Sequence, residues 1–337
     1  MSKPPSEVPQ GAIRFNTDSQ KMEFFAQDQW WEMATDFPYL GGNHNQSQTA
    51  TNNSNDLSAG TRGVWIGGEP LTSTMSYTTL ETGGDTKLFG DCAHGGSGLA
   101  NTGTVGSRVR GIHAGGEPAT STMASFTFAT LGNAVHTNED LTASRRFVTG
   151  ISGSDRGIFM GGSEPTRVNK IEYISIASFG NALDFGDLQE GKDCGGGGAW
   201  SNGVIGGVMG GYIEGGSNST KIEYVTIPTL GNAFDFGDTA EAKHNVASTS
   251  NSTRAIGAGG SPSETNAIQY ITMATKGNAT HFGDLTDGTT SMNACASPIR
   301  AVWGGGNIGP SKTNKMEYVS FATLGSAVNF GGTLGQG

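Results

Sequence analysis

Charged residues are scarce in this chain of 337 residues: they make up 15% of it, against about a quarter in a typical soluble domain. The net charge is −10, and the few lysines and arginines form no cluster. Nucleic-acid binding draws most of its affinity from Lys and Arg contacts to phosphates, so this composition argues against it. The acidic balance also argues against attachment to an anionic membrane surface.

Long apolar runs are missing as well. No stretch approaches the ~18 consecutive apolar residues of a membrane span, so we expect no membrane insertion. The start, MSKPPSEVPQGAIRF, lacks the apolar core of a secretory signal. There are only three cysteines, Cys92, Cys194 and Cys295, with no CxxC pair. We interpret them as unpaired thiols, buried or half-buried, with a disulfide or a reactive thiol as alternatives.

Motifs of catalysis and metal binding are absent too. The six histidines form no HxH, HExxH or His-Cys cluster, and we find no GxSxG, phosphate-binding loop or calcium loop. We therefore expect no metal, no cofactor and no enzymatic activity. A glycan-degrading propeller enzyme stays as a minor alternative, since it needs only two carboxylates in one pocket.

What the sequence does contain is glycine, with 55 residues, more than twice the average share of about 7%. Glycine reaches positive φ without a Cβ clash, which suits tight turns between short strands. Each glycine in a helix costs roughly 0.5–1 kcal/mol relative to alanine, so the composition disfavours long helices. The glycines follow no G-X-Y period, which excludes collagen.

A phrase typified by NKIEYISIASFGNALDFGDL (169–188) recurs along the chain, and internal repeats of this kind decide a fold. Clear copies start at residues 220, 266 and 314, and weaker ones at 73 and 121. Before each copy stands a second phrase that ends in two glycines, such as TRGVWIGG (61–68). In the fourth unit the paired glycines are either Gly206-Gly207 or Gly210-Gly211. Five units carry an arginine ahead of these glycines: Arg62, Arg110, Arg156, Arg254 and Arg300.

Each unit of about 48 residues contains four predicted strands. The third strand, KIEYISIAS, alternates with period two, and turn residues separate the strands. We therefore predict an all-β protein in which residues 41–337 form a six-bladed β-propeller. A β-solenoid or a stacked sandwich is the alternative, but a solenoid normally needs distinct capping repeats and the end units here are ordinary. Residues 41–59 are a linker or, in part, the first strand of blade one.

The unit resembles the kelch repeat. Paired glycines end the second strand, an aromatic such as Tyr173 lies in the third, and a Phe of the FG pair such as Phe185 lies in the fourth. Kelch repeats usually carry Trp at that last position, so the propeller is kelch-like rather than a strict member. The resemblance covers the repeat region and implies the same four-stranded blades.

Residues 1–40 lie outside the repeat, and three short strands (AIRFN, KMEFF and WWEMA) predict a small β-meander there. So short a meander cannot bury its own aromatic residues. They need either the flank of the propeller or another protein, and we interpret the segment as a docking segment. The candidate docking residues are Phe15, Phe24, Phe25, Trp30 and Trp31.

This segment is similar to one found in structural proteins of tailed phages, of the form G-x-I-R-[YF]-N-T followed by K-x-E-[YF] and Trp. It is matched here by Gly11, Ile13, Arg14, Phe15, Asn16, Thr17, Lys21, Glu23, Phe24 and Trp30. The glycine-rich repeat likewise resembles repeats in virion proteins of marine phages, including cyanophages. Together these resemblances imply a protein of a phage particle, made in the host cytoplasm and bound to other virion proteins, with a homotrimer as one possible state.

Polar residues that recur in every unit are interpreted as architecture rather than chemistry. The arginine before the paired glycines is expected to join neighbouring blades, and the Asp of FGD to bond local backbone N–H groups. The Lys and Glu of KIEY are expected to form a solvated or an inter-blade pair. What varies is the loop after the paired glycines, and variable loops on a rigid scaffold are common binding sites. Trp200 and Tyr212, in the irregular fourth unit, are candidate receptor contacts, with blade packing as the alternative.

The function we expect is a tail fibre or tail-associated adhesin, docked through the N-terminal segment and binding a glycan or protein of the host surface with the propeller. A capsid decoration or head fibre protein is the alternative.

Overall fold

In the computed structural model the chain divides into two units, Met1–Gly42 and Asn43–Gly337. The structure describes residues 9, 12–16, 21–26 and 29–32 of the first unit. In the second it describes residues 62–68, 70–92, 98–107, 109–195 and 198–335.

The first unit contains the predicted meander of three strands. They are β1 (Ile13–Asn16), β2 (Lys21–Ala26) and β3 (Gln29–Glu32), paired antiparallel in the order β1-β2-β3. Phe25 is buried and lies 5.3 Å from Trp30 between ring centres. The guanidinium of Arg14 covers the same Trp30 ring at 4.2 Å and pairs with Glu23 at 2.8 Å. The meander therefore packs two of its aromatic residues against each other.

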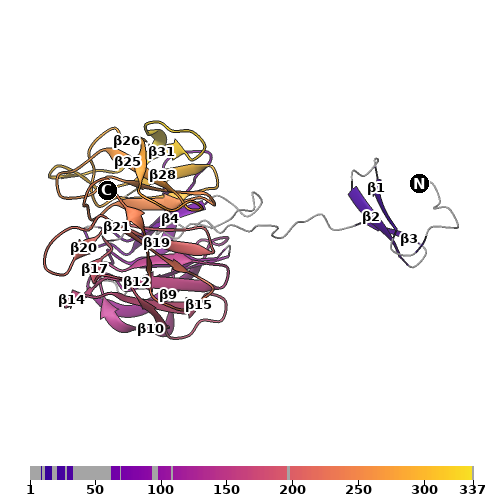
Figure 1. Cartoon of the computed structure of the whole chain (residues 1–337), viewed down its shortest axis with the longest axis horizontal. Coiled ribbons are helices and arrows are strands. Elements are labelled where there is room, and N and C mark those ends of the chain that lie inside the picture. The colour runs from indigo at the N-terminus through magenta and orange to yellow at the C-terminus, as the bar shows by residue number, and fades with distance from the viewer. Residues whose placement is uncertain are drawn as a thin grey trace. The chain divides into compact units, whose positions relative to one another are not determined.

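The second unit is a β-propeller, as the repeat predicts (Figure 1). Each blade is an antiparallel sheet in which every strand pairs with the next strand of that blade along the chain. Their strands, blade by blade, are β4 (Arg62–Ile66), β5 (Thr74–Thr79) and β6 (Lys87–Asp91); β7 (Gly103–Gly106), β8 (Arg110–Ala114), β9 (Thr120–Thr127) and β10 (Val135–Arg145); β11 (Thr149–Ser152), β12 (Arg156–Met160), β15 (Lys170–Ser175) and β16 (Leu183–Asp187); β18 (Ala199–Ser201), β19 (Ile205–Met209), β21 (Lys221–Thr226) and β22 (Phe234–Asp238); β23 (Ala247–Ser250), β24 (Arg254–Ala258), β25 (Ala267–Thr272) and β26 (Thr280–Asp284); β27 (Asn293–Ala296), β28 (Arg300–Gly304), β31 (Lys315–Ser320) and β32 (Val328–Thr333). The first strand predicted for blade one falls outside the described residues.

Two short hairpins lie in the loops: β13 (Ser163–Glu164) with β14 (Thr166–Arg167), and β29 (Asn307–Ile308) with β30 (Ser311–Lys312). A third two-stranded sheet pairs β17 (Lys192–Asp193), which precedes blade four, with β20 (Tyr212–Ile213), which follows the second strand of that blade.

The blades close into a ring. The first strands of blades two to six contact one another in sequence, and β27 of blade six contacts β4 of blade one. Hydrogen bonds stabilise this last junction. The backbone N–H of Thr86 donates to the carbonyl of Thr333 at 3.0 Å, and the carboxylate of Asp85 accepts from the backbone N–H of Thr333 at 2.8 Å. A solenoid or a stack of sheets would leave these two end blades apart, so the propeller prediction is confirmed.

The core consists of six apolar clusters, each shared by two adjoining blades. The kelch-like aromatic pair stands in these clusters. Tyr270 of the third strand meets Phe282 of the fourth at 5.8 Å, with ring planes at 80°. Four other blades repeat this edge-on contact between the third-strand tyrosine and the Phe of FG. Both faces of each blade are thus buried against a neighbour, which explains why the alternating third strand has no solvated face.

The repeated arginines join neighbouring blades, as predicted. Arg156 donates to the carbonyls of Ile227 and Pro228 in the next blade at 3.1 and 2.9 Å, while its guanidinium covers Tyr173 of its own blade at 5.0 Å. Arg62, Arg110, Arg254 and Arg300 donate to the corresponding carbonyls of the blades that follow them. Each bond supplies a donor to carbonyls just after a third strand.

The FGD and GN motifs form a second link between blades. The backbone N–H of Asp238 donates to the side chain of Asn278 in the next blade at 2.9 Å. A Cβ on the neighbouring Gly237 would lie 2.5 Å from the carbonyl oxygen of Gly277, so only glycine allows this approach. The Asp side chain differs from the prediction: it accepts from the hydroxyl of Thr220, at the start of the third strand, rather than from local N–H groups. The turn of the next blade thus covers the edge of the fourth strand, which is the last strand of its sheet.

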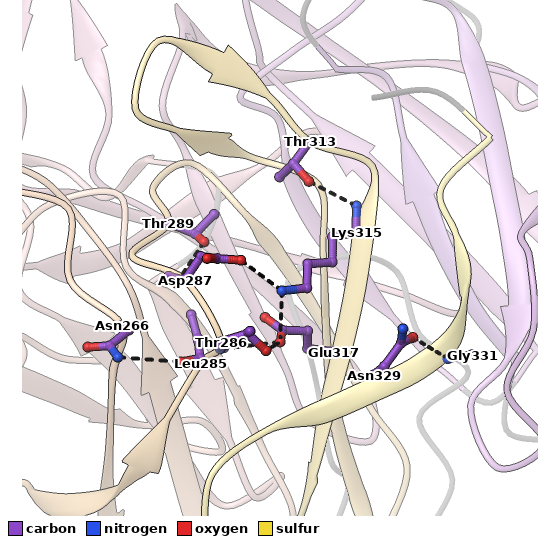
Figure 2. Close-up of polar contacts among 10 residues, drawn as sticks. All are labelled: Asn266, Leu285, Thr286, Asp287, Thr289, Thr313, Lys315, Glu317, Asn329 and Gly331. Carbon is purple, nitrogen blue, oxygen red and sulfur yellow. Dashed lines mark hydrogen bonds and ion pairs between the residues drawn. The ribbon is translucent and has the colours of Figure 1, made fainter.

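The glutamates of the third strands are buried, and Figure 2 shows one of them. Glu317 of β31 accepts from the backbone N–H of Thr286 at 3.3 Å and also from its hydroxyl, where the chain leaves blade five. Lys315 pairs with Asp287 at 2.8 Å and with Glu317 at 3.4 Å.

The Lys and Glu of KIEY do not form one common pair: Lys170 pairs with Glu172 of its own strand at 3.4 Å, whereas Lys221 pairs with Glu190 at 2.9 Å. Glu223 pairs instead with Lys192, at the junction with the preceding blade.

The face that carries the turns between third and fourth strands alternates from blade to blade. In blades two, four and six it presents two apolar side chains, each more than half exposed: Val109 with Leu131, Val204 with Leu230, and Ile299 with Leu324. In blades one, three and five the second of these positions is Gly83, Phe179 or Lys276, each with a left-handed φ between 53° and 75°. On this face the repeating unit is thus a pair of blades, and the ring has approximate three-fold symmetry.

Candidate functional site

The opposite face carries the paired glycines and the segments that lead into the first strands. In blade four the left-handed pair is Gly210-Gly211, with φ of 67° and 119°, which matches the pairs of the other blades. Gly206 and Gly207 lie inside β19 instead. The N–H of Gly211 donates to the carbonyl of Lys243 at 2.9 Å, and the equivalent bond joins each other pair of successive blades from blade one to blade six. This ambiguity of the sequence is therefore settled, and the variable loops are all placed on this face.

One residue in the segment before the first strand is left-handed in four blades. These residues are Asn101, Phe147, Asn245 and Ser291, with φ between 53° and 58°. An Asn tolerates this conformation, whereas a bulky residue is an outlier there at a cost of roughly 1–2 kcal/mol. Phe147 is the exception of the four. Strained residues of this kind concentrate at functional sites, so Phe147 marks this part of the face.

The larger of two cavities on this face has a volume of about 660 Å³. Its lining includes Asn101, Phe147, Asn245, Ser291 and Glu117. It also reaches Trp65 of β4.

The smaller cavity has a volume of about 250 Å³ and adjoins the larger one at Phe147 and Asn245. Its other lining residues come from loops of three successive blades: Arg146, Ser163, Pro165, Arg167, Asp193, Tyr212 and His244. Two guanidinium groups, an imidazole, a carboxylate and two aromatic rings thus meet in one hollow. We call it the Arg167 pocket.

Arg167 holds the pocket together. Its Nε donates to Asp193 Oδ2 at 2.9 Å, and its guanidinium lies 4.1 Å from the ring centre of Tyr212. The nearest oxygen of Glu214 is 4.0 Å from Nη1, too far for a hydrogen bond. Burial raises the pKa of the Asp193 carboxyl, although the positive charge of Arg167 opposes this shift. Among the described residues, the two terminal nitrogens of Arg167 therefore keep their N–H donors for a ligand.

His244 and Arg146 complete the polar wall. His244 lies 5.1 Å from Tyr212 between ring centres, and its Nδ1 is 2.7 Å from Asn218 Oδ1. Because an amide oxygen only accepts, Nδ1 carries the proton and Nε2 is the free acceptor of the neutral ring. Burial is the main cause that lowers the pKa of His244, and the positive charge of Arg167 lowers it further. Arg146 is half-exposed and pairs with Glu117 at 3.1 Å.

The structure separates the two residues that the sequence suggested as receptor contacts. Tyr212 is half-buried and lines the Arg167 pocket. Trp200 is fully buried in β18 and meets Phe236 edge-on at 5.2 Å, within the cluster shared by blades four and five. The prediction that Trp200 is an exposed contact was wrong, and blade packing, its alternative, is correct.

Of the candidate docking residues in the meander, Phe25 is buried and Trp30 is half-buried. The side chains of Phe15, Phe24 and Trp31 lie outside the described part of the chain.

Sequence reasoning missed Phe147, Arg167 and His244. One signal was available: aligning the segments before the first strands places Phe147 in the column of Asn101, Asn245 and Ser291, where it is the only large side chain. Arg167 and His244 gave no such signal, because they belong to loops of different lengths in different blades.

The cysteines match their interpretation as buried thiols. Cys92, Cys194 and Cys295 are free and buried. Burial raises the pKa of Cys92 to about 11 and that of Cys194 to about 12. Within the described residues, no group of three His, Cys, Asp or Glu side chains is placed to hold a metal ion. The same residues include no helix that is long and apolar enough to cross a membrane.

A comparison of the chain with known protein families finds no match. A search of the curated proteins likewise finds no similar sequence. The functional argument therefore rests on the chain's own residues.

Proposed function

We propose that this chain is a non-enzymatic structural protein of a phage particle, a tail fibre or tail-associated adhesin. It docks through the N-terminal meander, and the propeller binds the surface of the host cell. The observation that supports the proposal is that the chain consists of two parts with different features. A separate meander unit similar to segments of tailed-phage proteins precedes a closed propeller whose variable loops enclose a pocket on one face.

The two cavities support binding rather than hydrolysis. Each is lined by one carboxylate among the described residues, Glu117 in the larger and Asp193 in the smaller. Glycoside hydrolysis uses two carboxyl groups on opposite sides of the scissile bond. Turnover of glycans by the purified protein would contradict this part of the proposal.

The location on the particle is tested by labelling. Antibodies against the propeller, applied to intact particles of the virus that encodes the chain, are expected to mark the tail in electron micrographs. Labelling over the capsid would instead identify a decoration or head fibre protein, and no labelling would overturn the proposal of a virion protein.

Docking is tested by deletion. A variant without residues 1–40 is expected to be lost from the particle, yet to keep the thermal unfolding of the propeller, because the meander forms a unit of its own. Normal incorporation of the shortened chain would contradict the docking role of the meander. A matched control replaces only Pro4 and Pro5 with alanine, ahead of the three strands, and should leave incorporation intact.

A further inference from the structure

The Arg167 pocket offers an unusual set of groups for its size. Its volume corresponds to about eight water molecules at ~30 Å³ each, room for one sugar ring but not for two. Cationic side chains outnumber acidic ones in its lining, with Arg146 and Arg167 against Asp193, although Glu117 pairs with Arg146 at 3.1 Å and an oxygen of Glu214 lies 4.0 Å from Arg167. The pocket therefore favours a small ligand that carries negative charge.

The guanidinium of Arg167 is pre-oriented for such a ligand. Asp193 holds its Nε, and stacking on Tyr212 fixes its plane. A planar guanidinium with two free terminal nitrogens binds a carboxylate through two parallel N–H···O bonds, which a lysine cannot reproduce. The oxyanion of the ligand is thus expected at Arg167.

Phe147 adds an aromatic ring to the lining, and the guanidinium of Arg146 lies 5.4 Å from its ring centre. Phe147 is half-buried and stands at the edge that the pocket shares with the larger cavity. The ring is held there despite the cost of its left-handed backbone, at a position where Asn101 and Asn245 tolerate that conformation. An aromatic ring beside polar groups suits a ligand with one apolar face, and His244 Nε2 adds an acceptor for a hydroxyl group.

We propose that the Arg167 pocket binds a sugar residue that bears a carboxylate, as in an acidic glycan, with its carboxylate on Arg167, a hydroxyl group on His244 and its C–H face on Phe147. This inference rests on the proposed role of the propeller in binding the host surface, and it names the site and the class of ligand.

The direct test measures binding of glucuronate to the full-length protein by calorimetry, with glucose and inorganic phosphate as comparison ligands. Glucuronate is expected to bind at least tenfold more tightly than either. If glucose binds as tightly as glucuronate, the carboxylate plays no role in recognition. If phosphate binds as tightly as glucuronate, the pocket recognises anions in general and not a sugar. Either result overturns the inference.

Two variants locate the site. Arg167→Lys keeps the positive charge but removes the planar guanidinium with its two terminal nitrogens. Phe147→Asn introduces the residue that the equivalent position before blade five carries, Asn245. Each is expected to weaken glucuronate binding at least fivefold. Phe147→Asn should do so while the melting temperature stays equal or rises, because strain is relieved, so lost binding cannot be attributed to misfolding. Unchanged affinity in both variants would refute the assignment of the pocket.

Lys312→Gln is the matched control. It removes an exposed cation from the lining of the larger cavity on the same face, away from the Arg167 pocket. Glucuronate affinity should not change, and a loss as large as that of Arg167→Lys would show that overall charge, not this pocket, decides binding.

A cell-binding experiment separates this inference from the proposed function. If the wild-type protein and both pocket variants bind host cells equally, the pocket inference fails while the proposed function stands. If glucuronate binds in the pocket but the wild-type protein does not bind the cells, the proposed function fails instead.

Discussion

The ammonium group of Lys276 lies 4.4 Å from the ring centre of Tyr224, in the preceding blade, and also bonds its hydroxyl group. Four other blades cover this tyrosine with an arginine of their own second strand. Blade four has Ile205 at the arginine position. A lysine from blade five therefore supplies the cation that blade four lacks.

Blade two shows the reciprocal arrangement. It keeps Arg110 but has Ser125 at the tyrosine position, and Phe179 of blade three brings its ring to 4.3 Å from the guanidinium. Phe179 and Lys276 occupy the same turn position, and both are left-handed. The contact between a cation and an aromatic ring is thus kept in all six blades, although in blades two and four one partner comes from the next blade.

This compensation predicts the outcome of a double-mutant cycle. Lys276→Leu should destabilise the propeller by about 1–2 kcal/mol, because it removes the cation–π contact and the bond to Tyr224. Adding Ile205→Arg should recover most of the loss, since an arginine there can reach the same ring and the carbonyls of the next blade. Urea unfolding measures both changes.

A control for this cycle is Lys312→Leu with and without Ile205→Arg, since Lys312 is exposed and far from Tyr224. The two substitutions should then be additive. Additivity in the Lys276 cycle as well would show that the lysine does not replace the arginine.

Closure of the ring depends on Arg300, which donates to the carbonyls of Leu80 and Glu81 in blade one at 3.3 and 2.6 Å. Arg300→Met keeps the aliphatic stem but leaves both carbonyls without a charged donor. We expect a loss of about 2–3 kcal/mol in the free energy of unfolding. Arg146→Met, at an exposed ion pair, should cost less than about 1 kcal/mol. Equal effects of the two substitutions would contradict a special role of the closing junction.

Most of the blade architecture could be read from the repeat, because the residues that recur are those that touch the next blade. The arginine, the paired glycines and the FG phenylalanine each keep one contact in most blades. The burial of Glu317 was harder to foresee. Its partner Thr286 lies two residues after the FGD motif of the preceding blade, and the residue at that place changes from unit to unit, with Thr142, Gln189 and Ala240 in the others that make this bond.

Trp200 shows where such reasoning fails. It lies in a strand of three residues after a run of glycines, too short for an alternation to reveal which side is buried. The Arg167 pocket could not be predicted from the sequence for another reason. Its residues come from three blades, and nothing in the sequence of one loop specifies which loop of the next blade it faces.

The pair Lys192 and Glu223 joins blades three and four at 2.6 Å, and both side chains are fully buried. Lys192→Met should destabilise the protein by about 3–5 kcal/mol, because it leaves a buried carboxylate without its counter-charge. Lys192→Met combined with Glu223→Gln removes both charges and keeps an oxygen for the N–H of Gln189, which Glu223 now accepts at 2.8 Å. The double variant is expected to be more stable than the single one in urea unfolding. A double variant no better than the single one would show that lost packing, not the unpaired charge, causes the damage.

His244 predicts how stability depends on pH. Its pKa is lowered in the folded protein by burial and by Arg167, whereas in the unfolded chain it stays near the ordinary value of about 6.5. As the pH falls below that value, the unfolded chain takes up a proton that the folded protein resists, so the free energy of unfolding decreases. His244→Gln retains an N–H for Asn218 but cannot titrate. Between pH 7.5 and 5.5 the variant should therefore lose less stability than the wild type. Parallel curves for His244→Gln and the wild type would mean that His244 takes up its proton equally in the folded and unfolded states.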